Sequence, residues 1–163
     1  MKRNLNFVAL AVLSAAAGSA VAAGMPKEGN FDYTACWTTV MNAIAYSKGN
    51  TAFSFELTGT QLSNPPGGPF DKESFRCVGS NAVFGKKVWA NATCEAVDRD
   101  GDKRLSYFYR GADGQVVREI IAGTGKFDGI VMNEKITPLG PYPAIKPGIV
   151  VNCNRHVGTY KMK

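Results

Sequence analysis

Hydrophobic and polar residues alternate with a period of two along short segments of this chain. Phe53, Phe55 and Leu57 fall on one face of an extended segment, and polar residues fall on the other. Residues 104–110 alternate in the same way. This period is typical of β-strands that separate two environments. The pattern predicts strands at residues 36–46, 51–59, 73–83, 87–97, 104–110, 115–122, 127–136 and 148–160, the last of them long enough to divide in two.

Turn residues separate these segments at short intervals, as at Gly49-Asn50, Gly85-Lys86 and Asp100-Gly101. Short strands joined by such turns are typical of antiparallel sandwiches and barrels. Residues 60–72 contain three prolines and two glycines, and we expect them to form a long loop. We therefore expect an all-β fold: a single antiparallel meander β-barrel of about eight strands.

The first residues have the composition of an export signal. Lys2 and Arg3 precede an apolar run from Phe7 to Leu13, and small residues follow up to Ala23. This order is typical of a cleaved signal peptide, and the run is too short to span a bilayer. We expect a periplasmic or secreted protein without a membrane span. Its predicted parts are a signal peptide at residues 1–23, a flexible N-terminal arm at residues 24–35 and a barrel domain at residues 36–163.

Four cysteines follow the signal peptide, and none belongs to a CxxC pair. An even number in an exported protein favours disulfides over a metal site. A two-residue turn at Gly85-Lys86, with glycine first, places Cys77 directly opposite Cys94 on an antiparallel pair. Cys36 and Cys153 are left, near the first and last strands, which are neighbours in a closed barrel. We favour these two pairs, and the other two connectivities stay open.

The charge of the chain is mildly positive and scattered. Without Lys2 and Arg3 of the signal peptide, the formal net charge falls from +6 to +4. The pairs Lys86-Lys87 and Lys103-Arg104 lie beside predicted turns, where solvated charge is expected. A nucleic-acid-binding protein would carry a basic stripe with interleaved aromatic residues. The sequence therefore predicts no nucleic-acid partner, and it leaves the oligomeric state undetermined.

Two stretches resemble segments of small exported bacterial proteins. They are residues 94–103, Cys-Glu-Ala-Val-Asp-Arg-Asp-Gly-Asp-Lys, and residues 123–130, Gly-Thr-Gly-Lys-Phe-Asp-Gly-Ile. Those proteins are similar to the allene-oxide-cyclase-like, or more broadly lipocalin-like, β-barrels. The resemblance covers roughly residues 73–135 and implies an eight-stranded barrel. Because the matched residues belong to turns and barrel corners, it implies no particular reaction and supplies no catalytic residue.

Two motifs suggest ion binding but lack the required spacing. Asp98, Asp100 and Asp102 resemble part of a calcium loop, yet the glycine of an EF-hand would come two places later, between helices. A hairpin turn with solvated aspartates is the better interpretation. The segment of residues 123–126, Gly-Thr-Gly-Lys, lacks the spacing of a phosphate loop and precedes a predicted strand. We predict no metal site and no cofactor.

His156 is the only histidine, and we expect it at the surface or at the end of a strand. A catalytic role would require a carboxylate beside it, such as Glu95 or Glu119. The chain has no nucleophile elbow, no His-Glu-x-x-His motif and no Cys–His nucleophile signature. We therefore predict no catalytic residue.

Aromatic residues on the predicted strands carry the main indication of function. A barrel of this size either packs its interior with side chains or holds one small ligand, and the sequence leaves both open. We expect an exported barrel that binds a small apolar or aromatic ligand. The alternatives are a cyclase- or isomerase-type enzyme with a barrel pocket, or an envelope protein–protein interaction module with an apolar patch near residues 60–72 or 137–147. The candidate ligand-binding residues are Trp37, Phe53, Phe55, Trp89, Tyr107 and Tyr109.

Overall fold

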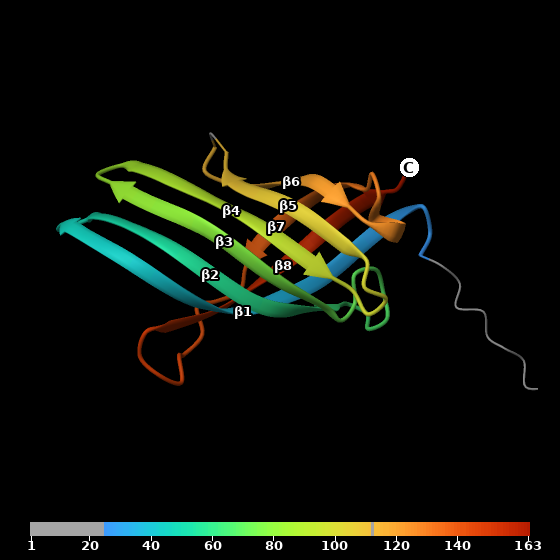
Figure 1. Cartoon of the computed structure of the whole chain (residues 1–163), viewed down its shortest axis with the longest axis horizontal. Helices are drawn as coiled ribbons and strands as arrows, with labels where there is room; N and C mark the ends of the chain where they lie inside the picture. The colour runs from blue at the N-terminus through green and yellow to red at the C-terminus, as the bar shows by residue number, and fades with distance from the viewer. Residues whose placement is uncertain (1–24, 112) are drawn as a thin grey trace, which may run out of the picture.

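The computed structural model describes residues 25–163 except residue 112, so the predicted signal peptide lies outside the described residues. Strands dominate this part of the chain (Figure 1). They are β1 (Glu28–Ser47), β2 (Asn50–Ser63), β3 (Glu73–Phe84), β4 (Lys87–Val97), β5 (Lys103–Arg110), β6 (Val116–Gly123), β7 (Val131–Pro138) and β8 (Ile149–Lys161). A short 3-10 helix, η1 (Gly125–Phe127), lies between β6 and β7.

The strands form one antiparallel sheet in the order β6-β5-β4-β3-β2-β1-β8-β7. Each strand from β1 to β5 pairs with the next along the chain, and the β7–β8 hairpin returns to pair β8 with β1. The sheet curls until its two edges, β6 and β7, approach each other (Figure 1). Among the described residues these edges share no backbone ladder. The predicted meander β-barrel is confirmed, and it is nearly closed.

Both predicted disulfides are present. The β3–β4 hairpin turns at Gly85-Lys86, and Gly85 has the positive φ of 59° that a glycine-first turn requires. This register places Cys77 opposite Cys94, and the two are bonded. Cys36 on β1 lies opposite Cys153 on β8, and this pair is bonded as well. The two bridges thus fasten two pairs of neighbouring strands.

Two stretches expected outside the sheet belong to it. The predicted arm at residues 24–35 is mostly strand, because β1 begins at Glu28 and pairs with β8 from that residue on. The polar residues of its outer face made this segment resemble a loop. Its inward residues Phe31, Tyr33 and Ala35 alternate with them and are buried. The loop predicted at residues 60–72 is also shorter, since β2 continues to Ser63.

The hydrophobic core closes one end of the barrel. Its buried members are Phe31, Tyr33, Ala35, Phe70, Phe127, Ile130 and Tyr160. The loop between β2 and β3 contributes Phe70, whose φ of 63° is unusual for a bulky residue. Gln61 fixes this loop by donating a hydrogen bond of 2.9 Å to the Phe70 carbonyl oxygen. At the other end, the long strands β1 to β4 project beyond the shorter ones as two hairpins (Figure 1).

Candidate functional site

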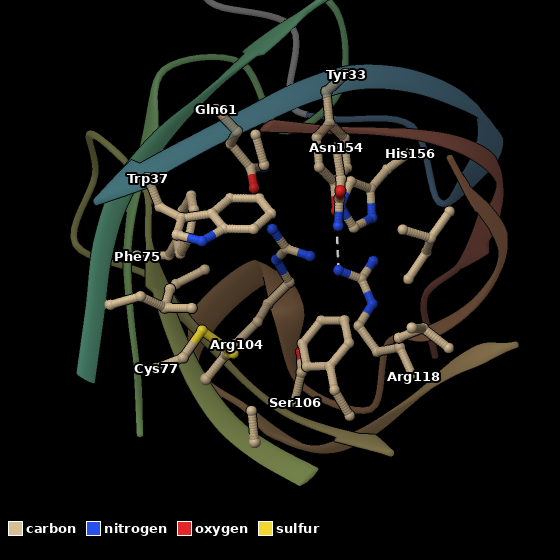
Figure 2. A pocket seen from close by; sticks show the side chains of 18 of the residues that line it. Tyr33, Trp37, Gln61, Phe75, Cys77, Arg104, Ser106, Arg118, Asn154 and His156 are labelled. Carbon is tan, nitrogen blue, oxygen red and sulfur yellow. Dashed lines mark hydrogen bonds between the residues drawn. A yellow bond between two sulfur atoms is a disulfide. The ribbon is translucent and has the colours of Figure 1, made fainter. Parts of the chain in front are cut away.

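A cavity of about 160 Å³ lies inside the barrel, between the core and the projecting hairpins. Apolar side chains from seven strands form much of its wall, and the Cys77–Cys94 bridge borders it. Figure 2 shows the guanidinium groups of Arg104 and Arg118 pointing into this interior. The apolar wall includes Trp37, Phe55, Leu57, Phe75, Phe108 and Val116. The cavity therefore combines an apolar wall with a charged interior.

Two of the six predicted ligand-binding aromatics, Trp37 and Phe55, line this cavity. Phe53 lies on the same strand as Phe55, two residues nearer the hairpin tip and away from the lining. Trp89 points outward from β4 and is 53% exposed. The cavity lining instead includes Phe75, which the sequence interpretation did not single out.

β5 alternates as predicted, but the face opposite to Tyr107 and Tyr109 points inward. The inward residues are Arg104, Ser106 and Phe108, all of which line the cavity. Tyr107 and Tyr109 are absent from that lining, and their rings stack with centroids 5.6 Å apart. The Tyr109 hydroxyl donates a hydrogen bond of 2.9 Å to Glu119 on the exposed surface. The inward face of β5 therefore carries Arg104, although hydrophobicity favoured the face of Tyr107 and Tyr109.

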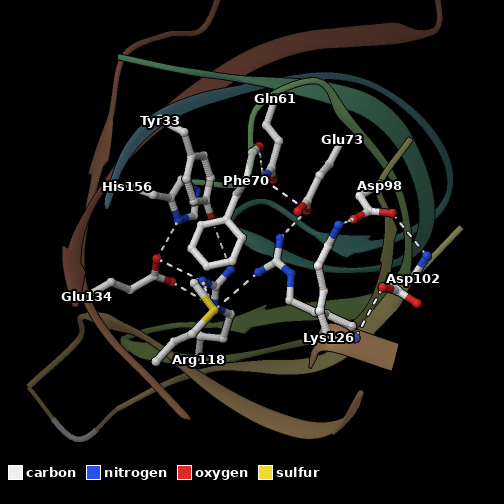
Figure 3. A network of polar contacts seen from close by, with 12 residues as sticks. Tyr33, Gln61, Phe70, Glu73, Asp98, Asp102, Arg118, Lys126, Glu134 and His156 are labelled. Carbon is white, nitrogen blue, oxygen red and sulfur yellow. Dashed lines mark hydrogen bonds and ion pairs between the residues drawn. The ribbon is translucent and has the colours of Figure 1, made fainter. Parts of the chain in front are cut away.

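Arg104 belongs to a buried ion pair with Glu73 from β3 (Figure 3). Both side chains are 1% exposed. Gln61 donates a hydrogen bond of 3.2 Å to the same carboxylate, and the Arg104 guanidinium lies 4.3 Å from the centre of the Phe70 ring. Burial alone would lower the pKa of Arg104, but the Glu73 carboxylate outweighs burial and raises it. Arg104 is therefore charged at every working pH.

A second buried group joins β6, β7, β8 and β1 (Figure 3). Arg118 Nη2 donates a hydrogen bond of 3.0 Å to Glu134, and Arg118 Nη1 donates one of 2.8 Å to the Tyr33 hydroxyl. His156 Nδ1 lies 3.1 Å from Glu134 Oε2, and its ring stacks on Tyr33 with centroids 4.7 Å apart. Arg104 and Arg118 also approach the Met132 sulfur, each at 3.2 Å. One connected polar group therefore fills the interior beside the core.

His156 is a buried member of this group, which corrects the prediction of a surface histidine. Its carboxylate partner is Glu134, whereas Glu95 and Glu119 form exposed contacts elsewhere. Burial lowers the pKa of His156 despite this partner. For Glu134, burial alone would raise the pKa, but Arg118 and His156 outweigh it and lower the pKa. At neutral pH the pair is a neutral imidazole beside a carboxylate.

The three aspartates near the β4–β5 turn hold η1 in place. The Lys126 amino group forms ion pairs with Asp98 and Asp100, and the Lys126 backbone N–H donates a hydrogen bond of 3.1 Å to Asp102. The Asp98 side chain is only 7% exposed, so the expectation of solvated aspartates is wrong for this residue. Among the described residues no cluster of His, Cys, Asp and Glu side chains is arranged to hold a metal ion.

Residues 25–163, apart from residue 112, include no helix long and apolar enough to cross a membrane. The two disulfides fit a protein that folds outside the reducing cytoplasm. No family model, curated protein or solved structure matches this chain. The resemblance to allene-oxide-cyclase-like or lipocalin-like barrels therefore stays a prediction, and the chemistry of the cavity carries the functional argument.

Proposed function

We propose that this is an exported periplasmic or secreted protein that binds one small, uncharged, apolar or aromatic group inside its barrel. The observation that carries the proposal is the cavity of about 160 Å³ walled by Trp37, Phe55, Phe75 and Phe108. An apolar cavity of roughly 150 Å³ is sufficient to bind benzene. The cavity therefore suits a single ring, or the ring end of a longer molecule.

The polar interior supports a neutral ligand over an anion. Arg104 and Arg118 are balanced by Glu73 and Glu134, so the buried set carries no net charge while His156 is neutral. Five hydrogen bonds join the two guanidinium groups to Glu73, Glu134, Tyr33 and Met132. An added carboxylate would lose its hydration and meet two arginines whose charges Glu73 and Glu134 already balance, which is costly in a buried site.

The test fills the cavity by one substitution. Ala92 lines the cavity, so Ala92→Phe places a phenyl ring inside it. The neighbouring Asn91 points outward and is exposed, so Asn91→Phe is the matched control. We expect toluene and phenol to cause saturable shifts of the Trp37 indole resonance in wild type and in Asn91→Phe, and none in Ala92→Phe. Benzoate should bind more weakly than either probe. Equal behaviour of the two variants, or no saturable shift in wild type, would overturn the proposal.

The His156–Glu134 pair favours a second candidate, an isomerase- or cyclase-type reaction. His156 lines the cavity as a neutral imidazole, the form that accepts a proton, and Glu134 holds it in place. Of the polar groups considered from the sequence, Glu95 and Glu119 face outward, and His156 lines the cavity. A bound carbonyl ligand should exchange an adjacent C–H with deuterium oxide in wild type and not in His156→Gln; equal exchange would remove this candidate.

A further inference from the structure

The projecting hairpins carry an uncovered apolar surface on their outer face. Register places Ile44, Ala52, Ala82 and Trp89 in one row across β1 to β4. Tyr46 and Phe84 follow nearer the turns. The large members are well exposed: Ile44 is 69%, Tyr46 79%, Phe84 41% and Trp89 53%. We call these six residues the tip patch.

The two hairpins form one rigid end rather than two separate loops. Asn50 at the start of β2 lies opposite Phe84 at the end of β3. The Asn50 side-chain oxygen also accepts a hydrogen bond of 2.9 Å from the Gly85 backbone N–H. Figure 1 shows both turns at the same extreme of the molecule. The tip patch is therefore a single surface at the far end of the barrel from the core.

The inner face of the same hairpins is apolar as well. Val83 lies opposite Val88, which is 43% exposed, and Phe53 follows on β2. A flat protein partner would cover one face of these hairpins and leave the other in water. An apolar phase into which the tips insert would remove the apolar side chains of both faces from water.

The charges at the tips are all positive. Lys48 lies in the first turn, and Lys86 and Lys87 lie in and after the second. Residues 40–54 and 78–91 contain no Asp or Glu. Among the described residues, none of these three lysines forms an ion pair. Folding thus gathers charges that are scattered along the sequence.

We propose that the two hairpin tips insert into the interfacial region of an anionic lipid bilayer. Trp, Tyr and Lys side chains are the types that favour the boundary between lipid headgroups and acyl chains. Each lysine close to an anionic surface strengthens binding roughly fivefold. A second copy of this chain fits the tip patch less well, because self-association would bring its lysines together without any acid between them. This inference does not depend on the proposed ligand.

The first test is flotation of the mature protein with vesicles. We expect binding to phosphatidylcholine vesicles that contain phosphatidylglycerol, and much weaker binding to phosphatidylcholine alone. Replacing Lys48, Lys86 and Lys87 by Gln should weaken binding on the order of a hundredfold. The control replaces three exposed lysines far from the tips, Lys27, Lys135 and Lys161, by Gln and removes the same charge. Equal losses in the two triple variants would overturn the proposal.

The second test reports insertion directly. Trp37→Phe leaves Trp89 as the only tryptophan of the chain. We expect its emission to shift to the blue when anionic vesicles are added, and Ile44→Ser to reduce the shift. An emission maximum that stays at its aqueous position would contradict insertion. Sedimentation without lipid provides a further check: a dimer that Ile44→Ser dissociates would assign the tip patch to a second copy instead.

Discussion

Replacing Glu73 by Gln would leave a positive charge buried without its partner. Glu73 and Arg104 are both 1% exposed and form an ion pair. Arg104 cannot turn toward water, because its guanidinium lies between the rings of Phe70 and Phe127, 4.3 and 5.3 Å from their centres. Gln fills the same space as Glu, so the substitution removes the charge and little volume.

The size of the effect follows from this burial. Removing one partner of a buried ion pair costs about 3–5 kcal/mol, because the remaining charge is uncompensated. That is a large part of the 5–15 kcal/mol that separates folded from unfolded states in typical domains. With a urea m-value of roughly 2 kcal/mol/M, the unfolding midpoint should fall by about 2 M. Replacing both residues, as Glu73→Leu with Arg104→Met, should recover most of the loss.

The assay is urea unfolding followed by tryptophan fluorescence, with a matched pair on the surface. Glu56 and Arg76 form two hydrogen bonds of 2.8 Å but lie in solvent, so Glu56→Gln should leave the midpoint unchanged within error. Similar losses in Glu73→Gln and Glu56→Gln would refute the reasoning. A double variant at Glu73 and Arg104 as unstable as the single one would refute it too.

Two further predictions concern pH and the disulfides. Burial lowers the native pKa of His156, so below the unfolded-state pKa of about 6.5 the unfolded chain binds more protons than the native one. The unfolding free energy should therefore fall as the pH drops through about 6.5, by at most about 1.4 kcal/mol per pH unit. His156→Gln should flatten this slope in urea titrations, and an unchanged slope would contradict it. Converting Cys36 and Cys153 to Ser should destabilise by about 5 kcal/mol, and Cys77 and Cys94 by about 3, because the loops span 117 and 17 residues. Calorimetry that finds the reverse order would oppose this chain-entropy account.

The strands were predictable because their signals are local. Alternation and turn glycines place β3 and β4 to within a residue, and the turn at Gly85 then fixes both partners of Cys77–Cys94. The first half of β1 escaped prediction for the opposite reason. Its outward residues are polar, and its partner β8 lies at the other end of the chain, so nothing nearby in sequence marks it as strand.

The buried charges could not be predicted from composition or spacing. Glu73 and Arg104 are 31 residues apart, and they meet because β3 and β5 flank β4 in the curled sheet. One signal was available: Arg104 alternates in phase with Phe108, so an inward Phe108 implies an inward Arg104. Which face of β5 points inward depends on the whole barrel, however, and the aromatic Tyr107 and Tyr109 favoured the wrong face in the prediction.

The missing ladder between β6 and β7 gives the wall of this barrel a preferred line of opening. Arg118 on β6 contacts Glu134 and Met132 on β7 across this gap. Side chains therefore join these two strands, whereas backbone hydrogen bonds join the other neighbouring strands. Parting these strands breaks one ion pair and no rung of a ladder. Amide protons along β6 and β7 should therefore exchange with solvent earliest. A ligand too wide for the open end of the barrel would enter between these two strands.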